Sequence, residues 1–246
     1  MTDFSYALET VLPPAMGLIV LQSDETIEGD FRRLLPEAVT LHATRVPSAP
    51  EVTRETLAQM EGHIHATSAL LPGVTPYAAI GYGCTSGTAV IGQARIAELV
   101  QQGAPTQSVS EPVSALIAAC GALGITRLAF LSPYIAEVSQ HLRDVLATNG
   151  VATPIFGSFN EAEEAKVSRI DRASLIDAAL ELARAPEAEA VFLSCTNLRT
   201  LDVIDEIEER SGKPALSSNQ VLAWHMCKLA GFELARGRFG RLAAVG

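Results

Sequence analysis

Residues 77–88 read YAAIGYGCTSGT, and this stretch decides the predicted fold. Its apolar first half predicts a buried strand, and the glycine-rich turn that follows carries Cys84 at the expected start of a helix. Residues 190–197, AVFLSCTN, repeat the pattern with Cys195 at the turn. Because ligands bind at the carboxyl ends of the strands in a parallel sheet, we expect both cysteines to face a binding cleft.

Earlier in each half, a second pair of similar segments precedes an expected helix. LIVLQS ends at Ser23 and LAFLS ends at Ser132. Cys84 follows Ser23 by 61 residues, and Cys195 follows Ser132 by 63 residues. Similar motifs in the same order at nearly equal spacing predict a duplicated lobe. The repeat period of about 110 residues is that of a domain duplication and is too long for a solenoid repeat.

Short apolar runs alternate with helix-length amphipathic runs along the whole chain, which is typical of parallel sheets flanked by helices. We therefore predict an α/β protein of two similar lobes related by a pseudo-twofold axis, with the site between them. The N-terminal lobe is expected to contain residues 1–109 and 219–246, and the C-terminal lobe residues 110–218. Strands are expected over residues 16–21, 39–43, 77–82, 127–131 and 190–193, and helices over 25–35, 53–71, 86–102, 112–123, 135–149, 175–184, 201–211 and 219–229.

The composition indicates a compact protein with a sizeable core. The 246 residues are 48% hydrophobic and 19% charged, with a formal net charge of −10. No Lys/Arg cluster is present, so nucleic acid and anionic membranes are not expected partners. Residues 1–14 contain no Lys or Arg, and no apolar run reaches the roughly 20 residues that span a bilayer. The cytoplasm is the expected location.

The four cysteines form no CxxC pair and no zinc-ligand pattern with the five histidines, so no metal site is expected. In a reducing compartment all four should be free thiols. Cys120 and Cys227 fall in apolar helical patterns and are predicted to lie in the core. Cys84 and Cys195 occur at matching positions of the two halves, which favours a catalytic role over the alternative of inert buried cysteines.

Two thiols that face each other across a cleft can invert a carbon centre. One thiolate removes a proton while the opposite thiol delivers a proton to the other face. A helix that starts at each turn is expected to lower the thiol pKa and to favour a bound carboxylate. Addition of one thiolate to a double bond is the alternative route. Neither route requires a metal or an organic cofactor, so no cofactor is expected.

The motifs GYGCTSGT around Cys84 and SCTN around Cys195 resemble the two active-site motifs of the aspartate/glutamate racemase superfamily. Within it, the chain is most similar to the maleate cis–trans isomerase, arylmalonate decarboxylase and ectoine-utilisation racemase-like group. The resemblance extends from about Met16 to Gly231. It implies that Cys84 and Cys195 are the catalytic pair. The decarboxylases of this group lack the first cysteine, so Cys84 favours isomerisation or racemisation.

The same resemblance implies a set of residues that bind substrate. Thr85 and Ser86 match donors to a substrate carboxylate, Tyr134 matches a tyrosine that hydrogen-bonds substrate, and Asn160 matches an asparagine that contacts substrate in the maleate isomerases. Thr196 and Asn197 add short polar donors beside the second cysteine.

The first strand–helix turn departs from the maleate isomerases, which carry Ser-Asn where this chain has Ser23-Asp24. A carboxylate repels a second substrate carboxylate and attracts an ammonium group, so Asp24 favours an amine-bearing acid over maleate. The alternative is that Asp24 is a helix N-cap, and the two roles can coexist. The acidic run from Glu161 to Glu164 is expected to be a solvated helix start.

These observations predict a cofactor-independent racemase or isomerase of a small carboxylic acid. The alternatives are a maleate cis–trans isomerase, an arylmalonate-type decarboxylase and, outside the enzymes, a small-molecule binding protein. The partner implied is the small carboxylate substrate. The sequence does not fix the oligomeric state, and a homo-oligomer stays open.

Overall fold

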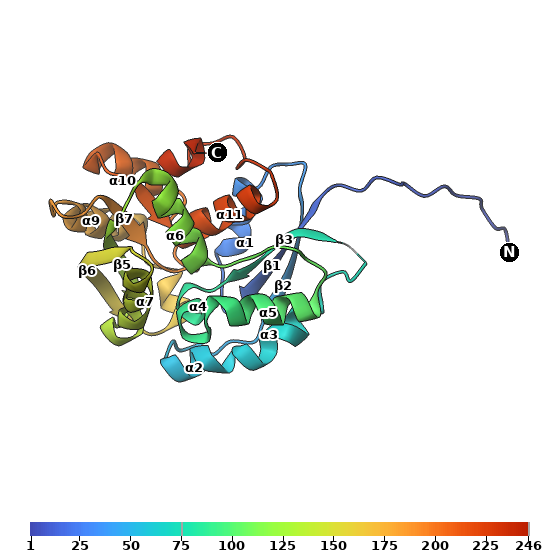
Figure 1. Cartoon of the computed structure of the whole chain (residues 1–246), viewed down its shortest axis with the longest axis horizontal. Coiled ribbons are helices and arrows are strands. Elements are labelled where there is room, and N and C mark those ends of the chain that lie inside the picture. Colours follow the sequence, from blue (N-terminus) through green and yellow to red (C-terminus); the bar gives the residue numbers. More distant parts are fainter. Residues whose placement is uncertain (75, 246) are drawn as a thin grey trace.

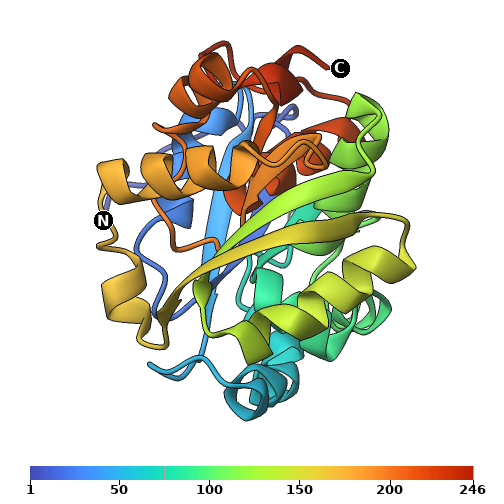
Figure 2. The same ribbon diagram turned by 90° about the vertical axis from the view of Figure 1, so that its left-hand side faces the viewer.

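The computed structural model describes residues 1–74 and 76–245 and contains two four-stranded parallel sheets (Figures 1 and 2). The strand orders are β2-β1-β3-β4 and β6-β5-β7-β8, so the second sheet repeats the order of the first. This repeat confirms the two-lobed α/β prediction. The strands are β1 Ala15–Leu21, β2 Thr40–Val46, β3 Tyr77–Gly83, β4 Val109–Ser110, β5 Arg127–Tyr134, β6 Ala152–Glu161, β7 Ala190–Leu193 and β8 Ala215–Ser217.

Helices cover both sheets. They are α1 Ile27–Leu34, α2 Arg54–Gln59, α3 Glu61–Ser68, α4 Thr85–Ile91, α5 Gln93–Gly103, α6 Pro112–Leu123, α7 Ala136–Thr148, α8 Glu164–Val167, α9 Arg172–Ala183, α10 Ile204–Ser211 and α11 Ser218–Leu229, with a 3₁₀ turn at Arg241–Ala244. Among residues 1–74 and 76–245, none of these helices is long and apolar enough to cross a membrane.

The central strands are the ones that the apolar runs predict. β1 lies between β2 and β3, and all seven of its residues are buried. β5 lies between β6 and β7 in the same way, with only Arg127 exposed at its start. A strand covered on both faces reads as a continuous apolar run, so these segments are recognisable from sequence. The three strands that were not predicted, β4, β6 and β8, all lie at sheet edges.

Two of the predicted helices are each divided in the structure. The helix expected over residues 53–71 breaks at Met60 into α2 and α3. The helix expected over 86–102 breaks at Gly92 into α4 and α5. Gly92 has a φ of 95°, a backbone conformation that glycine adopts without a steric penalty.

The last long helix, α11, connects the two lobes. It follows β8 of the second sheet but packs against β3 of the first sheet, and it also contacts α1 and α6 (Figure 1). Its first four residues, 218–221, are fully buried where the lobes meet. Residues 1–14 extend away from this body (Figure 1).

Candidate active site

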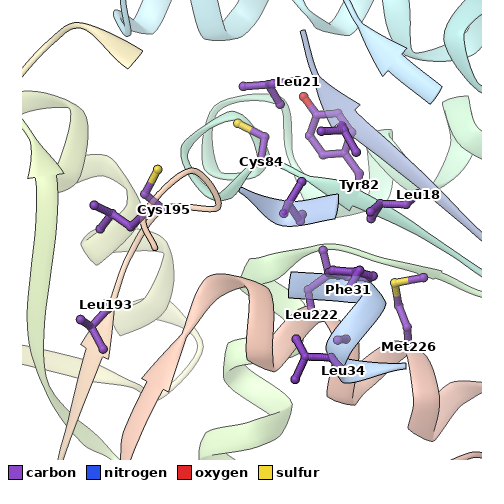
Figure 3. Close-up of a cluster of buried hydrophobic side chains, with 14 of the residues drawn as sticks. Leu18, Leu21, Phe31, Leu34, Tyr82, Cys84, Leu193, Cys195, Leu222 and Met226 are labelled. Carbon is purple, nitrogen blue, oxygen red and sulfur yellow. The ribbon is translucent and has the colours of Figure 1, made fainter. Parts of the chain in front are cut away.

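A small, largely buried cavity lies where the two lobes meet at the carboxyl ends of β1, β3, β5 and β7. Its volume is about 10 Å³, which is room for about one water molecule. Cys84 follows β3 and Cys195 follows β7, and the two thiols reach this cavity from different lobes (Figure 3). The cavity is lined by Leu21, Asp24, Val52, Leu57, Cys84, Thr85, Ser86, Tyr134, Glu164, Cys195 and Thr196.

Cys84 is the N-cap residue of α4, and its Sγ accepts a hydrogen bond from the N–H of Gly87 at 3.2 Å. A side chain at Gly87 would place its Cβ 2.8 Å from that sulfur, so the close approach requires glycine. Burial nevertheless raises the pKa of Cys84 to about 12, because desolvation outweighs the Gly87 N–H. The N–H groups at the start of α4 lower this pKa as expected, but burial outweighs them.

Cys195 is held in a strained conformation with a φ of 146°. Its N–H donates to the Ser218 hydroxyl at 3.0 Å, and its Sγ accepts from the N–H of Asn197 at 3.2 Å. Burial raises the pKa of this thiol well above its usual range, and the Glu164 carboxylate raises it further. A helix was expected to start at the Cys195 turn. Instead, a turn and a bend over residues 196–198 follow Cys195, and α10 begins only at Ile204.

Glu164 is a further candidate site residue, which the sequence pattern did not indicate. It was expected on a solvated helix start, but it is only 4% exposed and lines the cavity. Its Oε1 accepts from the Tyr134 hydroxyl at 2.6 Å, and its Oε2 accepts from Asn197 Nδ2 at 2.8 Å. Burial raises the pKa of this carboxyl. One signal was present in the sequence: Glu164 lies three residues before the apolar Val167, on the same helix face.

Asp24 lies just before α1 and lines the cavity. Its Oδ1 accepts the N–H groups of Thr26 and Ile27, at 2.8 and 2.9 Å, and so caps the start of α1. Its Oδ2 is buried and makes no hydrogen bond within the part of the chain that the structure describes. Burial raises the pKa of this carboxyl, because the two N–H groups, the nearby Thr196 hydroxyl and the Arg45 charge offset only part of the desolvation. Asp24 therefore presents an unpaired oxygen at a cavity that could bind a donor.

The other predicted binding residues divide into two groups. Ser86, Thr85 and Thr196 line the cavity, although the Thr85 hydroxyl donates to Ser218 Oγ at 2.8 Å and the Thr196 hydroxyl to a main-chain carbonyl. Asn197 lies behind the wall, where Oδ1 accepts the N–H of Glu25 and Nδ2 binds Glu164.

Asn160 does not reach the cavity. It is exposed and has a φ of 55°, and its N–H donates to Ser158 at the end of β6. The residue that this segment does bring to the cavity is Glu164, four positions later. The predicted contact between Asn160 and substrate therefore does not fit this geometry, because Asn160 is exposed near the end of the edge strand β6 and does not line the cavity.

The cavity is acidic and thiol-rich. Two carboxyl groups, two thiols and one phenol share it with hydroxyl groups, and none of its lining residues is Lys, Arg or His. Among residues 1–74 and 76–245, no group of three His, Cys, Asp or Glu side chains is arranged to hold a metal ion. The arrangement supplies proton donors and acceptors on opposite sides of one small volume.

Cys120 and Cys227, predicted as core residues, are each 1% exposed in the hydrophobic core. All four cysteines are free.

Comparison with known proteins gives relatives of two kinds. The arylmalonate decarboxylase of Bordetella bronchiseptica is 33% identical over 142 residues, which is 57% of this chain and 58% of the relative's length. The maleate isomerase of Geobacillus stearothermophilus is 25% identical over 219 residues, covering 82% of this chain and 86% of the relative.

Solved structures give the same two groups. A liganded double mutant of arylmalonate decarboxylase has a TM-score of 0.78 at 27% identity, covering 93% of this chain and 98% of that chain. The maleate isomerase of Pseudomonas putida S16 with maleate has a TM-score of 0.83 at 21% identity, covering 95% and 98%. These relatives confirm the aspartate/glutamate racemase-like superfamily that the two cysteine motifs predict. The arylmalonate decarboxylase family model matches residues 16–243, and the chain belongs to that family.

Proposed function

We propose that this protein is a cofactor-independent isomerase that racemises or epimerises a small amine-bearing carboxylic acid. The observation that carries the proposal is the pairing of Cys84 and Cys195 across one largely buried cavity, beside the unpaired Oδ2 of Asp24. Relatives named for isomerisation and for decarboxylation support cysteine-dependent chemistry of this general kind.

The two thiols provide the acid and the base. They come from corresponding turns of the two lobes, so they approach a bound carbon atom from opposite sides. In the proposed reaction one sulfur removes the proton beside the substrate carboxylate and the other sulfur returns a proton to the opposite face. The Ser86 hydroxyl is the proposed donor to the carboxylate, because it lines the cavity next to Cys84.

The charge of the cavity favours an amine-bearing substrate. A dianion would meet Asp24 and Glu164 without a Lys or Arg among the lining residues. An ammonium group would instead stabilise the ionised form of Asp24 and satisfy its unpaired oxygen. A zwitterion thus brings into the cavity the positive charge that the lining residues lack.

Two other reactions follow from the relatives. Maleate cis–trans isomerisation is the first alternative, because maleate isomerases match this chain over 82% of its length or more. Arylmalonate decarboxylation is the second, although Cys84 occupies a position where, by the resemblance above, the decarboxylases lack a cysteine. The proposed compartment is the cytoplasm, where reducing conditions keep both thiols free.

Hydrogen–deuterium exchange tests the proposal. The protein is incubated in deuterated water with single enantiomers of amino acids and hydroxy acids, and exchange at the α-carbon is followed by NMR. We expect exchange together with loss of optical activity for an amine-bearing acid. Conversion of maleate to fumarate, or release of carbon dioxide from an arylmalonate, without any α-exchange would replace the proposal with the corresponding alternative.

A further inference from the structure

A closed ring of hydrogen bonds joins Cys195 to Glu164. The Tyr134 hydroxyl lies 3.0 Å from Cys195 Sγ and donates to Glu164 Oε1 at 2.6 Å. On the other side, Asn197 donates from Nδ2 to Glu164 Oε2 at 2.8 Å and from its main-chain N–H to Cys195 Sγ at 3.2 Å. All four residues are buried. Cys84, in contrast, is held by the main chain of α4 through the N–H of Gly87.

The Tyr134 hydroxyl has one proton and two neighbours, so it can donate a hydrogen bond to only one of them. Its shorter contact is with Glu164, so the hydroxyl donates there, and the Cys195 thiol donates to the Tyr134 oxygen. A second arrangement contains the same two protons. The S–H bond breaks as a new Tyr134 O–H bond forms, and the former Tyr134 proton moves to Glu164. Cys195 becomes a thiolate, Glu164 becomes neutral, and the ring keeps one negative charge in both arrangements.

We propose that Glu164 is the proton reservoir of Cys195, with Tyr134 relaying the proton between them. The inference rests on the proposed function, since a two-thiol reaction needs Cys195 to alternate between thiol and thiolate. Glu164 acts through Tyr134 and is in this sense a positioning residue. The relay lets Cys195 change its protonation state inside a largely buried cavity without exchanging that proton with solvent.

Burial supports one shared negative charge. It raises the pKa of both Cys195 and Glu164, and the Glu164 charge raises the pKa of Cys195 further, which disfavours two charges in the ring. The titratable groups that face Glu164 are Tyr134 and Cys195 within the ring and Asp24 and Cys84 across the cavity. The charge of Asp24 raises the pKa of Glu164 further.

Alkylation of the substrate-free protein tests the relay. Reaction with iodoacetamide at pH 8 reports the thiolate fraction, and mass spectrometry resolves the rate at each cysteine. The measured quantity is the rate at Cys195 divided by the rate at Cys84. Because both sulfurs line the same cavity, a change in access affects both rates. The Glu164 charge raises the pKa of both thiols, but only Cys195 is hydrogen-bonded within the ring, so a change in the ring acts more strongly on Cys195.

The two ring variants should shift this ratio in opposite directions. Glu164→Gln removes the competing charge and frees the Tyr134 hydroxyl to donate to the thiolate, so the ratio should rise about tenfold. Tyr134→Phe removes the donor to the thiolate, so the ratio should fall about tenfold. Glu163→Gln is the matched control, because Glu163 is exposed and outside the ring, and its ratio should be that of the wild type.

Opposite shifts support the relay, and an unchanged ratio or equal shifts in both ring variants would overturn it. Circular dichroism checks folding. If Glu164→Gln does not fold, Tyr134→Phe alone decides, because an unchanged or increased ratio in that variant contradicts the relay. The assay contains no substrate, so its outcome is independent of the exchange experiment. Opposite shifts without any α-exchange would keep the relay and reject the proposed racemisation.

Discussion

At the scale of single residues, both thiols are buried and burial raises the pKa of each, but their surroundings differ. Cys84→Ser and Cys195→Ser should each lower turnover by about 10²- to 10⁴-fold, because a serine hydroxyl is a far weaker acid than a thiol. Serine at position 84 can still cap α4, so the fold should be retained. Steady-state kinetics and thermal unfolding of each variant give the two measurements.

Cys120→Ala is the control for these two variants. Cys120 is buried among apolar residues of α6, away from the cavity. Its replacement should lower the free energy of unfolding by about 1 kcal/mol and leave turnover unchanged. Near-normal turnover in either cavity variant would remove that thiol from the mechanism.

Asp24 is the residue expected to select the substrate. Asp24→Asn keeps an oxygen to cap α1 but removes the charge beside Oδ2. The kcat/KM for an amine-bearing acid should fall by about tenfold or more, and that for a plain diacid should rise. Measurement of both substrates in both proteins gives the change in preference.

Asp171→Asn provides the matched control, because Asp171 caps α9 on the surface through the N–H of Ser174. It should change neither preference. If Asp24→Asn only lowers the melting temperature and leaves the preference intact, Asp24 is a cap and nothing more.

The site could be predicted from sequence only where local pattern determines the position of a side chain. A cysteine directly after an apolar strand must lie at the carboxyl edge of the sheet, so Cys84 and Cys195 were placed correctly at one cavity. Glu164 was missed because its burial depends on side chains that are far from it in the sequence. It belongs to a run of acidic residues, and only its contacts with Tyr134 and Asn197 distinguish it from its exposed neighbour Glu163.

At the scale of elements, the contact between α1 and α11 contains a buried carboxyl. Asp30 of α1 is 7% exposed and accepts a hydrogen bond from Asn219 Nδ2 at 2.8 Å. Burial raises the pKa of Asp30 to about 6. The unfolded chain has a value of about 3.9, so the folded state binds this proton more tightly. The resulting stabilisation is complete below about pH 4 and is lost as the pH rises to about 6.

Asp30→Asn removes this titration and keeps an oxygen for Asn219. Relative to the wild type, the variant should gain about 3 kcal/mol in free energy of unfolding between pH 4 and pH 7, because only the wild type buries a charge at pH 7. Urea denaturation at the two pH values measures the difference. An equal difference at both pH values would show that Asp30 stays protonated or is solvated at pH 7.

The buried strands were predictable from their sequence, whereas the short or half-exposed edge strands were not. β1 and β5 are apolar throughout because helices cover both faces of each sheet, and their runs stand out. β4 and β8 have two and three residues, too few to show a period. β6 is half-exposed along an edge, where polar residues and Gly157 interrupt the pattern. The break at Gly92 was missed because glycine inside an apolar run does not by itself end a helix.

At the scale of the whole molecule, a short bridge between the two lobes, here called the clasp, joins residues 50–52 to residues 162–164 beside the cavity. Residues 50–52 of the first lobe pair with residues 162–164 of the second in an antiparallel bridge. The N–H of Val52 donates to Ala162, and the N–H of Glu164 donates to Pro50, each at 3.1 Å. Val52 and Glu164 also line the cavity, so the clasp forms part of its wall. Since the cavity holds about one water molecule, it must widen to admit a substrate, and we expect the clasp to be the part of the wall that opens.

A disulfide across the clasp tests this requirement. Glu51 and Glu163 face each other as a non-hydrogen-bonded antiparallel pair, for which the Cα separation is about 4.5 Å and permits a disulfide. Both side chains are exposed, so Glu51→Cys with Glu163→Cys should preserve the fold.

Oxidation of the double variant should lower turnover at least about tenfold, and dithiothreitol should restore it, because the disulfide prevents substrate entry. The single variant Glu51→Cys under the same oxidant controls for damage to Cys84 and Cys195, and peptide mapping verifies the new bond. Full turnover with the bond formed would mean that substrate enters by another route and that the clasp stays closed during catalysis.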